Sequence, residues 1–164
     1  MNITLKKFED TNLSFIEEML YEAVFWRKGP AVPSFEEGLA MPELKKALED
    51  FGKRSGDIAV TAYLDDLTPV GAAWLRYWKE EDQVRGFIAE NIPVLVIAVK
   101  KTFRHQGTAS KLIDWLVRYS AKQSIQQLSL CVSKDNLALD LYKKMGFSIY
   151  SDLEHSFNML RKIL

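Results

Sequence analysis

Cysteine, histidine and long apolar runs are all scarce in this chain of 164 residues. The single cysteine, Cys131, has no partner for an internal disulfide, and together with only two histidines it argues against a structural zinc site. No apolar stretch reaches the roughly 18 residues that a membrane-spanning helix needs, and the N-terminus does not have the pattern of a signal peptide. We therefore expect a cytoplasmic protein without a metal and without a membrane partner.

Net charge is absent as well, because 22 Lys and Arg residues balance 22 Asp and Glu residues. The balance is uneven: residues 1–50 hold ten acidic and six basic residues, whereas residues 99–122 hold six basic residues and the single acid Asp114. This local positive charge suits an anionic ligand with several phosphates, although a solvated basic helix face gives the same pattern. No basic stripe with interleaved aromatic residues is present, so nucleic acid is not an expected partner.

The hydrophobic pattern predicts one α+β domain over residues 1–164, because no linker rich in Pro, Gly or Ser divides the chain. Alternating or continuous apolar residues indicate strands over 3–8, 57–64, 69–78, 94–99, 128–132, 147–150 and 156–163. Helical spacing covers 12–26, 42–51, a segment that starts near 107, and 137–145, while 33–38 are expected to form a loop. The expected order is β-α-α-β-β-β-α-β-α-β-β around one mixed sheet.

The most informative segment joins the strand 94–99 to the next helix and reads Arg104-His105-Gln106-Gly107-Thr108-Ala109. A strand that leads into a helix through a tight turn leaves backbone N–H groups free at the helix N-terminus, where the helix dipole also favours an anion. Gly107 lets the backbone approach that anion closely. Neither a P-loop nor a dinucleotide-binding G-x-G-x-x-G is present, so the segment predicts a phosphate site of another kind.

This turn has the form [QR]-x-x-G-x-[GA], and the downstream segment Asn136 to Phe147 is similar to N-x-x-A-x-x-x-Y-x-x-x-G-F. Together and in this order, the two segments resemble the signature of the GCN5-related N-acetyltransferases (GNAT family). The match runs from Ile92 to Phe147, about a third of the chain. The expected order of strands and helices is also the one that this family has.

The resemblance implies that acetyl-CoA is the co-substrate. In the family the fourth and fifth strands splay apart and the pantetheine arm lies between them. By position, backbone groups of Ile97 and Val99 would pair with the pantetheine amides, and Asn136 would bind the arm near the thioester. The pyrophosphate would be held by backbone N–H groups of Arg104, His105, Gln106, Gly107, Thr108, Ala109 and Ser110.

The implied reaction moves an acetyl group from the thioester to the primary amine of a small molecule or peptide, by direct attack within a ternary complex. The Val99 N–H is placed to stabilise the oxyanion, and Tyr142 resembles the family's general acid. A phenol titrates near 10 and a thiol near 8.5, so hydrogen bonding to the thiolate is the larger expected contribution of Tyr142. The alternative for Tyr142 is a core tyrosine on an amphipathic helix.

The general base is unassigned, because Val94 and Leu95 stand where many family members carry a glutamate. Glu90 is the nearest acidic candidate and a weak one, since a solvated loop charge is the simpler interpretation. The same applies to the acidic residues of the preceding loop, which are Glu80, Glu81 and Asp82. His155 has a suitable intrinsic pKa, but an exposed turn histidine is the simpler interpretation.

Five residues are candidates for binding the acceptor: Phe25, Trp26, Trp74, Arg76 and Trp78. Aromatic walls near Glu36 and Glu37 would suit an amine cation. Packing of the sheet against a helix is the alternative for both Trp74 and Trp78. A non-catalytic acyl-CoA-binding or regulatory module is the alternative for the whole chain, and the sequence also permits a homodimer through its last strands.

Overall fold

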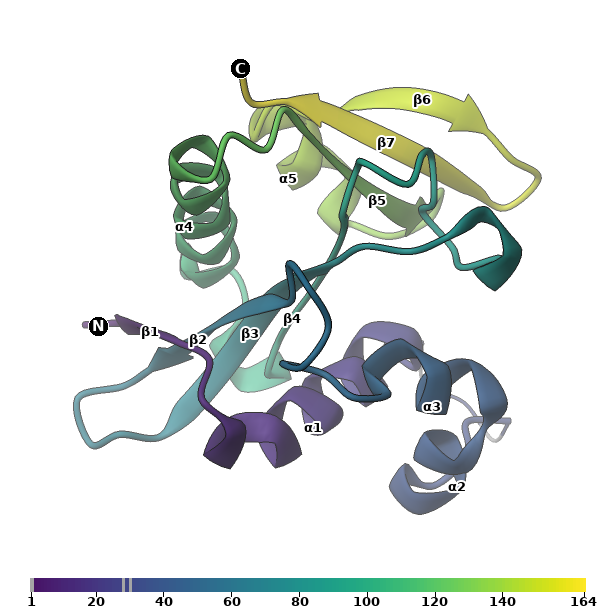
Figure 1. The fold of residues 1–164 in the computed structure, drawn as a ribbon. Helices are drawn as coiled ribbons and strands as arrows, with labels where there is room; N and C mark the ends of the chain where they lie inside the picture. Colours follow the sequence, from purple (N-terminus) through teal and green to yellow (C-terminus); the bar gives the residue numbers. More distant parts are fainter. Residues whose placement is uncertain (1, 28, 30) are drawn as a thin grey trace.

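A seven-stranded mixed sheet runs through the protein in the order β1-β2-β3-β4-β5-β7-β6, with helices on both faces (Figure 1). The computed structural model describes residues 2–27, 29 and 31–164. The strands are β1 (Thr4–Lys7), β2 (Ile58–Tyr63), β3 (Pro69–Arg76), β4 (Val94–Val99), β5 (Gln127–Ser133), β6 (Ser148–Asp152) and β7 (Ser156–Lys162). The helices are α1 (Leu13–Val24), α2 (Phe35–Ala40), α3 (Pro42–Leu48), α4 (Thr108–Lys122) and α5 (Ala138–Lys144). The predicted α+β class and mixed sheet are confirmed.

One element differs from the sequence prediction, because part of the expected loop 33–38 is helical. Helix α2 begins after Ser34, whose Oγ accepts the N–H of Glu37 at 3.2 Å. This is the first half of a capping box, in which a serine side chain satisfies a free donor of the first helical turn. Among the described residues, three α-helices therefore lie between β1 and β2.

The two faces of the sheet pack against different helices because strand side chains alternate. Ile58 and Val60 of β2 lie in the cluster that also contains Leu112 and Leu116 of α4. Ala59, between them, lies in the second cluster with residues of α1 and α3. Figure 1 shows these layers, with α1, α2 and α3 together on one side of β1–β4 and α4 on the other.

Strands β4 and β5 separate almost as soon as they meet. In the described part of the chain, their parallel pairing consists of Val94 opposite Ser129, supported by a 3.1 Å hydrogen bond from the Ser129 N–H to the Pro93 oxygen. The other neighbours of these strands are fully paired, since β4 pairs with β3 over six residues and β5 with β7 over seven. The sheet therefore opens between its two halves, as Figure 1 also shows.

The register of β4 determines which backbone groups face this opening. The Lys100 N–H donates to the Val70 oxygen at 2.8 Å, which fixes the even-numbered residues of β4 as those bonded to β3. Groups alternate sides along an antiparallel strand. The N–H and C=O groups of Ile97 and Val99 therefore point away from β3, toward the side on which Pro93 binds Ser129.

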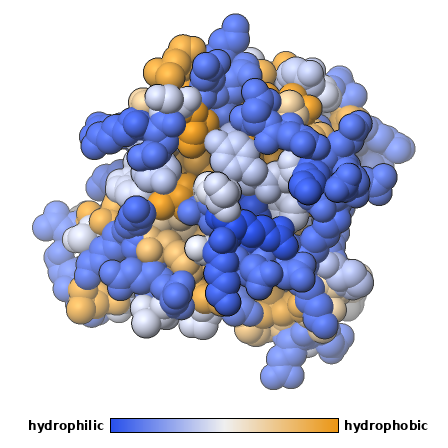
Figure 2. Space-filling model, viewed as in Figure 1, coloured by the Kyte–Doolittle hydropathy of each residue, from blue (hydrophilic) through white to orange (hydrophobic). Residues whose placement is uncertain are grey.

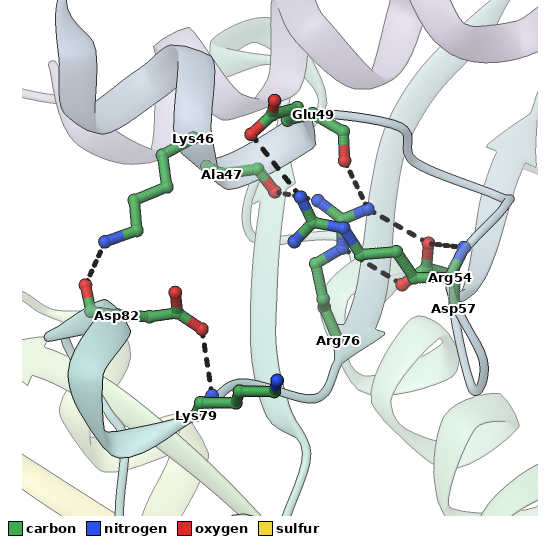
Figure 3. A network of polar contacts seen from close by, with 8 residues as sticks. All are labelled: Lys46, Ala47, Glu49, Arg54, Asp57, Arg76, Lys79 and Asp82. Carbon is green, nitrogen blue, oxygen red and sulfur yellow. Dashed lines mark hydrogen bonds and ion pairs between the residues drawn. The ribbon is translucent and has the colours of Figure 1, made fainter.

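A buried ion pair fixes α3 against the sheet (Figure 3). Arg76, at the end of β3, lies 3.0 Å from Asp57, and both side chains are at most 2% exposed. The same guanidinium donates to the main-chain oxygens of Ala47 at 3.1 Å and Glu49 at 2.6 Å, where α3 ends. These hydrogen bonds of the guanidinium thus all go to groups of the protein itself.

We expect Asp57→Asn to lower the free energy of unfolding by about 3–5 kcal/mol, because it leaves the Arg76 charge buried without a carboxylate. Arg54→Gln is the matched control, since Arg54 forms an exposed pair with Glu49 and its loss should cost less than about 1 kcal/mol. Urea unfolding measures both. Equal costs for the two variants would contradict the importance of the buried pair.

Candidate functional site

A groove of about 1040 Å³ occupies the opening between β4 and β5. Its walls come from all of β4, from the turn before α4, from β5 and α5, and from α1, α3 and the β3–β4 loop. Figure 2 shows hydrophobic side chains near the middle of the face seen in Figure 1, surrounded by hydrophilic ones. The splayed strands therefore create a space that is long, open to solvent and lined by both kinds of side chain.

Most of the residues predicted to bind the cofactor lie together on this groove. They are Ile97, Val99, Arg104, His105, Gly107, Thr108, Ala109, Ser110, Asn136 and Tyr142. Gln106 is exposed and is not among the lining residues. These residues are up to 45 positions apart in the sequence, from 97 to 142. The fold brings β4, the start of α4 and α5 to one surface.

The turn before α4 has the geometry that an anion needs. Gly107 has a φ of +84°, and a Cβ added there would meet no atom within 4 Å, so it would project into open space. His105 is left-handed too, with a φ of 62°. The Oγ1 of Thr108 is buried and has no hydrogen-bond partner among the described residues. Free N–H groups, an accessible backbone and an unused hydroxyl fit a phosphate.

Arg104 connects this turn to β4. Its Nε donates to the Val99 oxygen at 2.9 Å, and its terminal nitrogen lies 3.6 Å from the Glu22 carboxylate of α1. The guanidinium is therefore bonded to one of the β4 backbone groups that face the groove.

One of the two polar atoms of the Asn136 side chain makes a hydrogen bond within the protein. Its Oδ1 accepts the N–H of Ala138 at 2.9 Å and so caps α5, which leaves the side-chain NH₂ for a ligand. Asn136 is two residues before Ala138, one fewer than in the signature. The first position of the motif therefore falls on Asp135. Asp135 forms an ion pair with Arg27 beyond the end of α1, and the hydrogen bond from Arg27 lowers the pKa of Asp135.

Tyr142 lies on α5 with its ring against Phe147 and is 9% exposed. Burial raises the pKa of Tyr142 to about 12. The phenol is therefore a hydrogen-bond donor throughout the physiological pH range. It is also a weaker acid than an ordinary tyrosine, so proton transfer to a thiolate is less favourable than the sequence alone suggested.

Most of the candidate general bases lie outside the lining of the groove. The Glu90 carboxylate accepts the N–H of Glu80 at 3.3 Å and is not part of the groove lining. His155 is exposed in the turn between β6 and β7, with a side chain 87% accessible. Among the acidic residues of the β3–β4 loop, Asp82 lines the groove, and Glu80 and Glu81 do not.

Four of the five acceptor candidates line the groove, and Phe25 instead lines a neighbouring cavity of about 430 Å³ together with Trp26. Trp74 and Trp78 are only 1% and 8% exposed. The rings of Trp78 lie under the guanidiniums of Arg54 and Arg76, at 5.8 and 5.5 Å. Trp78 is thus in contact with the protein's own groups, and Trp74 lies in the apolar cluster that also contains residues of α1 and α3.

Two groups of groove-lining residues escaped the sequence analysis: those of α3, and Gln83, Val84 and Arg85 of the β3–β4 loop. Lys46 of α3 donates to the main-chain oxygen of Asp82, and Arg85 lies 3.4 Å from Glu43 (Figure 3 shows the first contact). Gly86 follows with a φ of +86°, and a Cβ there would come within 2.9 Å of Val94. Neither segment carries a motif, so only the folded arrangement reveals that they meet.

We expect the stability of the wild type to fall more steeply than that of Tyr142→Phe as pH rises above about 10. The unfolded chain releases the phenol proton near pH 10 and the folded chain near 12, so the folded state binds more protons in between and loses stability. The difference should reach about 1 kcal/mol near pH 11. Denaturant titrations of both proteins measure it, and parallel curves would contradict the burial of this phenol.

No helix within residues 2–27, 29 and 31–164 is long and apolar enough to cross a membrane. No group of three or more His, Cys, Asp or Glu side chains there is arranged to hold a metal ion.

Comparison with known structures identifies the fold. A PaiA N-acetyltransferase from Thermoplasma acidophilum, in complex with coenzyme A, is 20% identical, with 99% of each chain covered and a TM-score of 0.71. A phosphinothricin acetyltransferase from Sinorhizobium meliloti, in complex with AcCoA, is 18% identical, with 99% of this chain and 89% of that chain covered and a TM-score of 0.71. A spermidine N-acetyltransferase from Vibrio cholerae, in complex with CoA and spermine, is 18% identical over 98% and 95% of the chains, with a TM-score of 0.66.

The sequence itself gives the same result at the level of the family. No curated protein sequence matches the chain. The model of the acetyltransferase (GNAT) family matches residues 17–147, which span both signature segments and all of β2 to α5. The chain belongs to the acetyltransferase (GNAT) family.

Proposed function

We propose that residues 1–164 form a single N-acetyltransferase domain that transfers the acetyl group of acetyl-CoA to a primary amine of a small molecule or peptide. The observation that supports this most strongly is the opening between β4 and β5, with the backbone groups of Ile97 and Val99 on one side and the Gly107 turn at its end. CoA or acetyl-CoA is bound in structures of similar fold.

In this proposal the phosphates of the cofactor bind the N-terminus of α4. The backbone N–H groups from His105 to Ser110 donate to the pyrophosphate, while the Arg104 N–H donates to the Lys101 oxygen at 3.4 Å. The Thr108 hydroxyl, which has no partner among the described residues, is available beside it. The pantetheine arm then follows β4, where its amides pair with Ile97 and Val99 as an added strand would. The Asn136 side-chain NH₂ binds the arm from the opposite wall.

The reaction is attack of a neutral amine on the thioester carbonyl. The carbon–nitrogen bond forms, the carbonyl oxygen takes negative charge, and the Val99 N–H stabilises that oxygen. The carbon–sulfur bond then breaks, the nitrogen releases its extra proton to solvent, and the Tyr142 hydroxyl donates a hydrogen bond to the departing thiolate. With a pKa of about 12, Tyr142 supports the thiolate mainly by that bond rather than by giving up its proton.

Acetyl-CoA binding and thiol release test this function. Gly107→Ala should bind acetyl-CoA at least about tenfold more weakly, because its Cβ projects into the space where charged hydrogen bonds to phosphate form. Gly146→Ala is the matched control: it has a φ of +92° and so suffers similar strain, and its Cβ would face Arg161 rather than the groove. Both variants should lose roughly 1–2 kcal/mol of stability from the left-handed backbone.

Calorimetric titration with acetyl-CoA measures the affinities, and CoA thiol release in the presence of a panel of amines measures turnover. An affinity that both glycine variants leave unchanged would remove the turn from the cofactor site. Failure of the wild type to bind acetyl-CoA at all would contradict the proposed function as a whole.

Arg104 provides an independent prediction, because its side chain donates a hydrogen bond to the Val99 oxygen, which the pantetheine arm would also need. Arg104→Ala should strengthen the binding of acetyl-pantetheine, which lacks phosphates, and weaken the binding of acetyl-CoA by about tenfold. Lys111→Ala, which removes a basic residue outside the groove lining, is the control for general charge. If the affinities for both probes change in the same direction and by the same factor, Arg104 does not compete for Val99.

A non-catalytic acyl-CoA-binding module is the second candidate. It is favoured by the aliphatic side chains of Val94 and Leu95 and by the position of Glu90 outside the groove. Both candidates bind acetyl-CoA, but only the enzyme releases CoA thiol faster when an amine is added. That dependence on the amine separates the two.

A further inference from the structure

Helix α1 presents two glutamates, one turn apart, to the segment that follows β4. Glu18 lies 3.9 Å from Lys100, and Glu22 lies 3.6 Å from Arg104. Residues four positions apart share one face of a helix, and α1 packs against β4. This face of α1 therefore lies along the stretch that leads from β4 to the Gly107 turn.

The two glutamates differ in what they face. Glu22 lines both the groove and the neighbouring cavity of about 430 Å³, and Glu18 lines neither. The charged residues in the described lining of that cavity are Glu22, Arg27, Lys101 and Arg104. Glu22 is therefore the one charged side chain among them that can accept a proton. Phe25 and Trp26 line the same cavity, so the apolar body of an acceptor would have aromatic walls on which to pack.

A single guanidinium connects Glu22 to the proposed point of acetyl transfer. The Nε of Arg104 donates to the Val99 oxygen at 2.9 Å, and a terminal nitrogen of the same group faces Glu22. The Val99 N–H, to which the proposed mechanism assigns the oxyanion, points to the same side of β4 as that oxygen. The carboxylate is thus one head group away from the backbone at which the thioester carbonyl would bind.

The other two acids of the described groove lining lie toward the opposite end of β4. Glu43 belongs to α3 and Asp82 to the β3–β4 loop, and these two segments contact each other. The loop packs on Val94, at the start of β4. Val94 is five residues before Val99, which is roughly 16 Å along a strand. Within the described lining, Glu22 is therefore the acid with a direct chain of contacts to Val99.

We propose that Glu22 is the general base of the reaction, a role that rests on the acetyltransferase function proposed above. The neutral amine gives its electron pair to the carbonyl carbon, and its nitrogen then carries one proton too many. The Glu22 carboxylate accepts that proton as the carbon–nitrogen bond forms. Its side chain is 36% exposed, so it can pass the proton on to solvent and return to the charged form.

The contact with Arg104 makes this role depend on acetyl-CoA. One guanidinium holds the Val99 oxygen and the Glu22 carboxylate together. A pantetheine amide would compete for the Val99 oxygen, and the nearby phosphates would attract the guanidinium, since arginine binds phosphate strongly. Movement of Arg104 toward the phosphates would release Glu22 when the acetyl group is in place, so acetyl-CoA should bind before the amine.

Glu22→Gln tests this proposal, because it keeps the size of the side chain and removes the proton acceptor. Glu18→Gln is the matched control, since Glu18 lies on the same face of α1, is also paired with a base and is outside the groove lining. Glu22→Ala, assayed with and without added formate, adds a readout that a structural role would not change. CoA thiol release with phenethylamine, tryptamine, spermidine and a dipeptide amine gives kcat, and calorimetry gives the acetyl-CoA affinity of each variant.

We expect Glu22→Gln to lower kcat about 10²–10⁴-fold with every acceptor that the wild type acetylates. Its acetyl-CoA affinity should not be weakened, because the phosphates no longer compete with Glu22 for Arg104. Formate should raise the rate of Glu22→Ala in proportion to its concentration and leave the wild type unchanged. Glu18→Gln should match the wild type.

Four results would overturn the proposal while leaving the cofactor site intact. They are full turnover by Glu22→Gln, an equal loss in Glu18→Gln, no response of Glu22→Ala to formate, and no acetylation of any acceptor by a protein that binds acetyl-CoA. Absence of acetyl-CoA binding by the wild type would instead contradict the function on which the proposal depends.

Discussion

The separation of β4 from β5 is the constraint on which the rest of the site depends. Had these strands continued to pair beyond Val94 and Ser129, the backbone groups of Ile97 and Val99 would bond to β5 and no groove would exist. Because they diverge, a central strand keeps a free edge inside the protein. Unpaired backbone groups at such an edge are costly in apolar surroundings, so the edge is suited to a ligand that supplies amides. The Nε of Arg104 donates to the Val99 oxygen at this edge.

A second constraint fixes the opposite wall of the groove. Arg76 joins the end of β3 to Asp57 and to the C-terminal carbonyls of α3, so α3 keeps its position beside the β3–β4 loop. Lys46 of α3 contacts Asp82 of that loop, and Arg85 of the loop contacts Glu43 of α3, so the two segments are joined. The sequence analysis placed Arg76 in the acceptor site; that role stays a prediction, and every hydrogen bond of its guanidinium goes to the protein itself.

Sequence was sufficient for those features that depend on local pattern. Apolar runs predicted β2 and β3, and the strand-turn-helix pattern around Gly107 predicted a tight turn at the start of α4. Helix α2 was predictable as well, since Ser34 and Glu37 have capping-box spacing, but its single turn of apolar residues is too short to give a clear periodicity. The contact between Lys46 of α3 and Asp82 of the β3–β4 loop could not be found in this way. It joins residues 36 positions apart, which only the folded chain brings together.

Hydrogen exchange at individual amides of β4 tests the central claim most directly. The amides of Ala98 and Lys100 face β3, and those of Ile97 and Val99 face the groove. The account predicts that Ala98 and Lys100 are protected with or without acetyl-CoA, while Ile97 and Val99 exchange faster in the free protein and become protected when acetyl-CoA binds. Equal protection of all four amides in both states would contradict it, because the free edge of β4 would then have no part in binding the cofactor.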